Sequence, residues 1–258
     1  MSLKSIRPND SPSKSLPSKL KLAFSKAADH RRISKLFTKE VKSKIDPDDF
    51  VVKREKQIFD KTINDGHAAF LYSPDTGEVY TLTMAYHVNE KQGYHKHTEI
   101  GTSLASLPGF KSAQIAVAAL VLKEWWLSEP NGKIVTEILP ENAPSLKLYR
   151  DNLNWRPIFN KKITEELHKL CNENIAPEDK GRPTLWFECD AGTLPIMAKI
   201  LLDYIDQGRL NNKHTGQQIE LDLEALQNIG LSRQRIEMIA KGFTSKQALL
   251  SKPGAPQP

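Results

Sequence analysis

Apolar spacing in the first half of the chain predicts a strand, two helices and a β-hairpin. Residues 20–25 form a short strand-like run, and from Asp29 the apolar positions Ile33, Leu36, Phe37 and Val41 recur at helical spacing. A second helix is expected at about 53–64, with Gly66 as its C-terminal stop. Two alternating runs, 67–72 and 78–88, flank a turn rich in Pro and Gly, which is typical of a hairpin.

The second half alternates strands with helices. We expect strands at 97–106, 133–139, 155–159 and 184–189, with helices at about 112–128, 142–152, 164–172 and 194–207 and a helical pair at about 223–241. The helix from Ser112 is apolar nearly all round, so other elements must cover most of it. A meander followed by a βαβ unit predicts an α+β fold, a mixed central sheet with helices on both faces.

Composition divides the chain into four parts. Residues 1–19 are rich in Ser, Pro and Lys and are expected to be a disordered basic leader, and 246–258 a disordered tail. Residues 20–190 hold the predicted sheet, and 191–245 read as a helical extension. Residues 1–44 carry 12 Lys and Arg against three acidic residues, which leaves the rest slightly acidic. A basic leader of this type favours a solvated tail over a nucleic-acid contact.

Cysteine usage and apolar run lengths bound the environment. Cys171 and Cys189 fit no metal spacing and no disulfide framework, so we expect a cytoplasmic protein in a reducing compartment. The longest apolar run, 115–122, is far shorter than the roughly 20 residues of a membrane span. No bound metal is expected, because His87, His95 and His97 lack a fourth ligand at a suitable spacing.

The stretch 97–155 has the arrangement of an anion site. A strand leads through Pro108-Gly109 into the apolar helix, whose first amides are free to face a ligand. Downstream, a helix opens at Asn142, carries Ser145 and Tyr149 and ends near Asn154-Trp155. Asn154 can adopt the left-handed conformation that a helix C-terminus often needs.

These motifs resemble the GNAT superfamily of N-acyltransferases over about residues 20–189. The family's cofactor loop, Arg/Gln-x-x-Gly-x-Gly/Ala, corresponds to Lys111, Ser112, Ala113, Gln114, Ile115 and Ala116, with Gln114 in place of the first glycine. Its Asn-x-x-Ala-x-x-x-Tyr motif corresponds to Asn142, Ser145 and Tyr149, with one extra residue after the tyrosine.

The resemblance implies an acyltransferase that moves an acetyl group from acetyl-CoA to an amine by direct attack. It implies backbone contacts to the pantetheine arm near Thr102, Ser103 and Leu104, and Tyr149 as proton donor to the departing thiolate. As base we expect Glu99, which stands where acidic bases occur in several branches of the family. A carboxylate with a reference pKa of about 4.3 needs burial or a relaying water for this task.

Other interpretations remain open from sequence. Tyr149 could be core packing, Glu99 could be a solvated strand charge, and the histidines could be surface residues. The fold could be an inactive binding module, as Gln114 suggests, or take a long-chain acyl donor. A helix-turn-helix at 223–241 is the weakest option, since only Arg233, Arg235 and Lys241 supply charge. The acceptor is expected to be a small-molecule or protein amine, and the extension offers a surface for a homodimer.

Overall fold

The computed structural model describes residues 16–88, 97–127 and 133–244. The expected leader (apart from residues 16–19), the loop at 89–96 with His95, and the tail lie outside these residues. The strands are β1 Lys19–Phe24, β2 Ala68–Tyr72, β3 Val79–Val88, β4 His97–Ala105, β5 Lys133–Ile138, β6 Arg156–Pro157, β7 Leu185–Cys189, β8 Arg209–Asn211 and β9 Gln218–Asp222. The longer helices are α3 Lys56–Asn64, α4 Ser112–Leu127, α6 Lys161–Cys171, α7 Leu194–Gln207 and α9 Arg233–Ala240.

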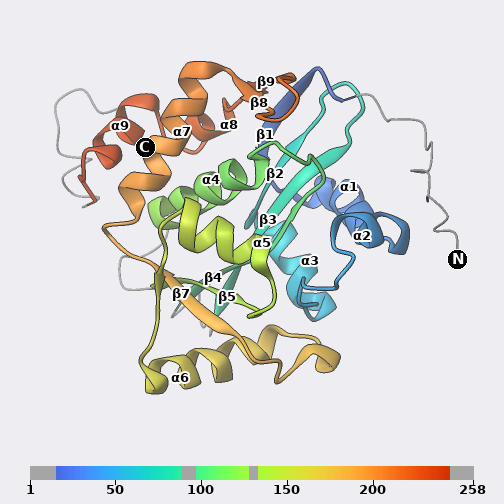
Figure 1. Ribbon diagram of the computed structural model, residues 1–258, viewed down its shortest axis with the longest axis vertical. Coiled ribbons are helices and arrows are strands. Elements are labelled where there is room, and N and C mark those ends of the chain that lie inside the picture. The colour runs from blue at the N-terminus through green and yellow to red at the C-terminus, as the bar shows by residue number, and fades with distance from the viewer. Residues whose placement is uncertain (1–15, 89–96, 128–132, 245–258) are drawn as a thin grey trace, which may run out of the picture.

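The nine strands of the described residues form one mixed sheet in the order β6-β7-β5-β4-β3-β2-β1-β9-β8. Strands β1 to β4 run as an antiparallel meander, and β5 joins β4 in parallel. Figure 1 shows α1–α3 at the right of the sheet and α7–α9 at the upper left. The predicted α+β fold, a mixed sheet flanked by helices, is confirmed.

Alternation along the central strands explains why both faces are covered. In β2, Ala69 and Leu71 belong to the core under α4, whereas Ala68 and Phe70 belong to the core under α1 and α3. Residues 114–124 of α4 are all buried, between the sheet and α7. The apolar helix is thus covered on most sides, as its sequence requires.

The first predicted helix is divided into shorter pieces. It appears as α1 His30–Ser34, a 3₁₀ turn at Lys35–Phe37 and α2 Lys39–Ile45. Thr38, which is extended with φ −64° and ψ 145°, separates the last two. The apolar spacing predicted the helical character of this segment correctly, but it did not indicate the break at Thr38.

The extension at 191–245 is not wholly helical, which corrects the expectation from sequence. After α7 ends at Gly208, β8 and β9 form a hairpin, and β9 pairs in parallel with β1 at the sheet edge. The segment Gln218–Asp222 alternates in burial, a strand pattern too short to stand out beside the helices. The helices α8 Ala225–Asn228 and α9 then follow, with Ser232 as the N-cap of α9.

Candidate active site

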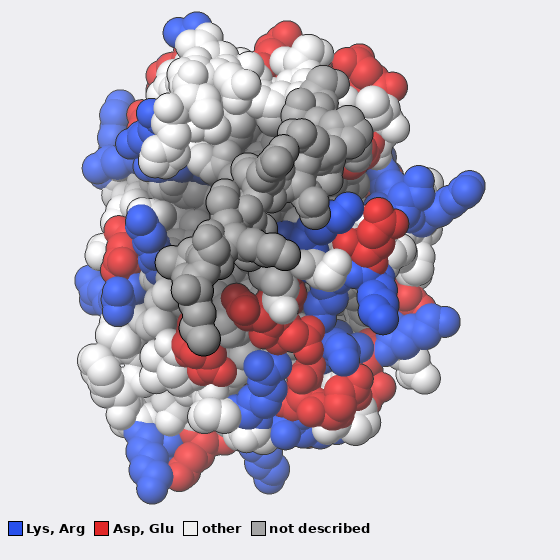
Figure 2. All heavy atoms as spheres, turned by 45° about the vertical axis from the view of Figure 1, so that its right-hand side comes forward, with Lys and Arg blue, Asp and Glu red and all other residues white. Residues whose placement is uncertain are grey.

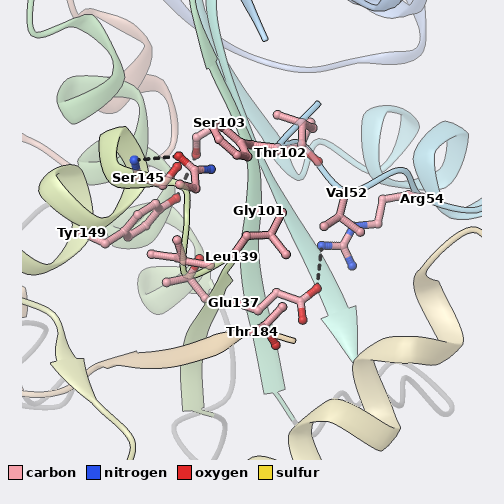
Figure 3. A pocket seen from close by; sticks show the side chains of 15 residues that line it. Val52, Arg54, Gly101, Thr102, Ser103, Glu137, Leu139, Ser145, Tyr149 and Thr184 are labelled. Atoms are coloured by element: carbon pink, nitrogen blue, oxygen red, sulfur yellow. Dashed lines mark hydrogen bonds and ion pairs between the residues drawn. The ribbon is translucent and has the colours of Figure 1, made fainter. Parts of the chain in front are cut away.

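A wedge opens in the sheet where β4 and β5 part. Their ladder runs from His97↔Lys133 to Glu99↔Val135 and stops there, although both strands continue. Beyond it a small cavity of about 50 Å³ lies between the two strands. Figure 3 shows side chains converging on it from β4, β5 and the segment before α3. Backbone groups that would otherwise pair across the sheet are therefore accessible to a ligand.

The β4 wall of the wedge contains a β-bulge. Thr102 and Ser103 stand opposite the single residue Thr83 on β3, because the register shifts between Leu82 and Met84. Thr102 has φ 49°, in the left-handed region that β-branched residues rarely adopt. A bulge leaves one residue out of the ladder and turns it away from the partner strand. Of the residues expected to contact a pantetheine arm, Thr102 and Ser103 line the cavity, whereas Leu104 is buried under the N-terminal helices.

Tyr149 lies on the opposite wall and reaches across to β4. Its hydroxyl is 2.8 Å from Ser103 Oγ, which in turn is 2.8 Å from Thr83 Oγ1. Its ring packs edge-on against Trp155, with centroids 5.1 Å apart. Burial raises the pKa of Tyr149 to about 12, although hydrogen bonds from Ser103 and Thr136 oppose the shift. The phenol therefore carries its proton at neutral pH.

The helix that carries Tyr149 explains the extra residue seen in the sequence. Asn142 caps α5 Ala143–Leu146 by accepting a hydrogen bond from the Ser145 amide at 3.1 Å, and a π-helix follows at Lys147–Asn152. A π-turn accommodates one more residue than an α-turn. Asn154 then adopts φ 54°, so its expected left-handed conformation is confirmed.

Glu99 is fully buried and forms a two-pronged ion pair. The two terminal guanidinium nitrogens of Arg54 donate to its carboxylate oxygens, Nη1 at 3.0 Å. Arg54 also lies over the Tyr86 ring, 4.4 Å from its centroid. The structure therefore excludes the solvated alternative for Glu99, and it commits this carboxylate to Arg54.

Glu137 on β5 is the second carboxylate of the site. Its Oε1 atom lies 3.6 Å from the Arg54 guanidinium and has no hydrogen-bond partner among the described residues. Burial, and then the nearby charge of Glu99, raise the pKa of Glu137 to about 8, with Arg54 acting in the opposite direction. Figure 3 shows it pointing into the wedge beside Arg54. A buried carboxyl that titrates near neutral pH suits a general base.

The segment that carries Arg54 is held by residues 175–179, which follow α6. Arg54 forms a β-bridge with Ile175, and the Lys53 carbonyl accepts a hydrogen bond from the Ala176 amide at 2.9 Å. The Lys53 amide donates to the Asp179 carboxylate at 2.8 Å. Arg54 and Glu137 were not predicted from the sequence. The contacts of the Arg54 segment with Glu137 and with residues 175–179 join parts of the chain more than 80 residues apart.

The turn before α4 is built differently from the expected cofactor loop. Lys111 is exposed and Ala113 half-buried, while Ile115 and Ala116 point into the core. The buried Ser112 hydroxyl and Gln114 Oε1 lack a hydrogen-bond partner among the described residues. Rotating the Gln114 carboxamide by half a turn would put its NH2 group, a hydrogen-bond donor, at the position of Oε1.

Gly109 lies close to the extension. Its φ is 81°, and a Cβ placed there would meet the Asn212 side chain at 2.7 Å. Asn212 also donates a hydrogen bond to the Pro108 carbonyl at 3.1 Å. The space that a Cβ would take at Gly109 is therefore filled by Asn212 of the β8–β9 hairpin.

Two of the remaining histidines join a buried charged cluster. His67 Nδ1 and His87 Nε2 each lie 3.0 Å from an oxygen of Glu124, and Lys123 Nζ lies 2.9 Å from the same carboxylate. Burial works to raise the pKa of Glu124, but the two histidines and Lys123 outweigh it and hold the pKa well below its ordinary value. The three ligand-type side chains could hold a metal ion. However, Lys123 already balances the carboxylate charge.

The surface gives little support to DNA binding at the expected helix-turn-helix. Arg235 is buried over the Trp126 ring and donates to the Gly230 carbonyl at 2.7 Å. Arg233 pairs with Asp206 and Glu237. In Figure 2, basic and acidic side chains are interspersed over the face shown. No helix in the described residues is long and apolar enough to cross a membrane.

Comparisons with known proteins find likeness in solved structures alone. No family model and no curated protein matches the sequence. The N-acetylglutamate synthase of Neisseria gonorrhoeae, solved with coenzyme A and N-acetyl-glutamate, superimposes with a TM-score of 0.43 at 10% identity over 67% of this chain and 35% of its own. The chain thus corresponds to about a third of that enzyme.

Two further structures match over nearly their whole length. The diaminobutyrate acetyltransferase of Paenibacillus lautus, in complex with its substrate and coenzyme A, has a TM-score of 0.43 at 10% identity over 66% of this chain and 94% of its own. A GNAT-family acetyltransferase of Bacillus cereus has a TM-score of 0.37 at 11% identity over 66% and 96%. Likeness this distant concerns the fold and says nothing of reaction or substrate.

Proposed function

We propose that the protein is an acyl-CoA-dependent N-acyltransferase that moves an acetyl group to an amine. The observation that carries the proposal is the wedge between β4 and β5, which is lined by both the Tyr149 phenol and the Glu137 carboxyl. A proton donor and a base that titrate four pKa units apart, about 12 and about 8, face the same cavity. Acyl transfer from a thioester to an amine needs this pair of roles.

The thioester, when bound, supplies an activated acyl carbon and a thiolate leaving group. We place its phosphates at the first amides of α4 with Lys111, the Ser112 hydroxyl and the Gln114 carboxamide. The pantetheine arm is placed along Thr102 and Ser103, where β4 has no partner on this side. Asn142 and Ser145 line the other side of the cavity.

In the reaction, Glu137 accepts a proton from the acceptor ammonium, and the neutral amine attacks the acyl carbon. The carbon–nitrogen bond forms, the carbon–sulfur bond breaks, and Tyr149 donates its proton to the thiolate. Ser103 holds the phenol in place through its 2.8 Å hydrogen bond. We assign the base to Glu137 in preference to Glu99, because Glu99 is already paired with Arg54 and Glu137 Oε1 is not hydrogen-bonded within the described residues. In this assignment Glu99 orients Arg54.

Isothermal titration with acetyl-CoA tests the proposal. We expect a micromolar dissociation constant, and acyl transfer when an amine is supplied. The absence of detectable binding at millimolar ligand would overturn it and leave an inactive binding module, the alternative that Gln114 suggests. Binding of octanoyl-CoA with no turnover of acetyl-CoA would instead indicate a long-chain donor.

A further inference from the structure

A second cavity adjoins the wedge on the α1–α3 face of the sheet. It has a volume of about 340 Å³ and shares Val51, Val52, Arg54 and Thr102 with the wedge. Ligand sites for small molecules begin at roughly 300 Å³, so this space suits a compound about the size of an amino acid. A molecule that fills it lies next to the Thr102 bulge.

The walls of this cavity are mainly apolar. Phe37 and Phe59, whose rings pack edge-to-face with centroids 5.0 Å apart, form one side with the branched side chains of the 51–52 segment. The fully buried Tyr86 forms the floor together with Thr102, whose Oγ1 lies 2.5 Å from the Tyr86 hydroxyl. An apolar group gains by transfer from water into such a space.

The charged side chains around the cavity are paired, except at its edge. His30 pairs with Asp60 at 2.7 Å, Lys42 pairs with Asp49, and Lys53 lies 3.4 Å from Glu178. Lys56 also borders the cavity, is exposed, and forms no ion pair within the described ranges. The cavity thus disfavours a second cationic group on the acceptor and favours a carboxylate at its edge.

We propose that this cavity binds the acceptor, and that the acceptor is a small amine with an apolar side group and a carboxylate, the class of the apolar amino acids. The inference rests on the proposed function. The side group packs against Phe37 and Phe59, the carboxylate lies near Lys56, and the amine passes Thr102 into the wedge toward Glu137. Glycine lacks the side group, and lysine and spermidine carry extra cations.

The first arm of the test measures kcat/KM for leucine, phenylalanine, glycine, lysine and spermidine with acetyl-CoA. Leucine and phenylalanine are expected to exceed the others at least tenfold, since about one methylene's worth of apolar contact changes selectivity by roughly that factor. Ser34→Leu, which adds bulk to the cavity lining, should raise KM for leucine several-fold and leave the acetyl-CoA dissociation constant unchanged.

The second arm separates the charge from the apolar contact. Lys56→Ala should raise KM for leucine about tenfold but not for leucinamide, whereas Lys39→Ala, an exposed lysine that does not line the cavity, should change neither. Equal use of all amines would overturn the inference and leave the proposed function intact. If Ser34→Leu impaired only the use of octanoyl-CoA, the cavity would bind the acyl chain, and the inference would also be overturned. If acetyl-CoA does not bind at all, the proposed function fails, and the inference fails with it.

Discussion

At the scale of single residues, the candidate chemistry depends on two protons held at different pKa values. Burial moves both groups in the same direction, to about 12 for Tyr149 and about 8 for Glu137. Because the tyrosine starts from about 10 and the glutamate from about 4.5, the same physical effect yields a donor and a base.

Replacing Tyr149 with Phe should lower kcat by roughly 10²–10⁴-fold, the usual range for a general acid, and change acetyl-CoA affinity only modestly. The phenylalanine keeps the ring contact with Trp155 and loses the proton. Tyr204→Phe, a tyrosine on α7 away from the cavity, is the matched control and should behave as the unaltered protein. An unchanged rate in Tyr149→Phe would remove this residue from the mechanism.

The pH profile distinguishes Glu137 from Glu99 as base. Only the deprotonated carboxylate accepts a proton, so the rate should rise with pH through about 8 and then level off. Glu137→Gln should lower kcat about 10²-fold or more and abolish this rise. The exposed neighbour Glu141→Gln should leave both unchanged. If the rise persists in Glu137→Gln and disappears in Glu99→Gln, the base is Glu99, as the sequence suggested.

At the scale of elements, the sequence predicted the positions of β1 to β5 and β7 well, missed β8 and β9, and gave no strand pairing beyond the β2–β3 hairpin. Periodicity located β2 to β5 within about two residues, because alternation is a local property. The bulge at Thr102 and the parting of β4 from β5 depend on neighbouring strands and have no local signal. Tyr149 was suggested by a motif, whereas Arg54 comes to Glu137 through contacts between the 50–55 segment and residues 175–179.

The contact between the extension and the turn before α4 can be tested at Gly109. Gly109→Ala should destabilise the protein by two contributions: the left-handed backbone, about 1–2 kcal/mol, and the clash with Asn212 at 2.7 Å. Gly77→Ala is the control, because Gly77 has φ 70° and an added Cβ there has nothing within 4 Å. Urea unfolding should show a larger loss at Gly109.

Removing the Asn212 side chain separates the two contributions. In an Asn212→Ala background, Gly109→Ala should cost about as much as Gly77→Ala does in the unaltered protein. If the two alanine substitutions cost the same in the unaltered protein, the hairpin does not pack on the turn as described.

At the scale of the whole molecule, one sheet joins every part of the described chain. We propose that residues 20–190 form the catalytic unit and that 191–245 completes it, since β9 extends the sheet at β1 and α7 covers α4. The sequence predicted a sheet domain and a separate helical extension, but the two share one sheet. Their shared core could not be predicted, because it depends on which apolar faces meet.

The cluster around Glu124 links β3, α4 and His67, the residue before β2, and it should make the stability of the fold sensitive to acid. The pKa of Glu124 is lower in the folded state than its reference value of about 4.3 in an unfolded chain. The carboxylate therefore contributes its full stability above about pH 5, and this is lost as the pH falls through the folded pKa. At neutral pH, Glu124→Gln should cost roughly 3–5 kcal/mol, because Lys123 is left buried without its counter-charge.

Urea unfolding of the unaltered protein and Glu124→Gln at pH 7, 5, 4 and 3 measures this linkage. The difference in unfolding free energy should be largest at pH 7 and shrink toward pH 3, because the unfolded chain binds a proton at this carboxyl before the folded protein does. Glu40→Gln, an exposed glutamate paired with Lys44 on α2, should change the unfolding free energy by less than about 1 kcal/mol at every pH. A constant difference across the series would mean that Glu124 acts through packing alone, and that its charge does not hold His67, His87 and Lys123 together.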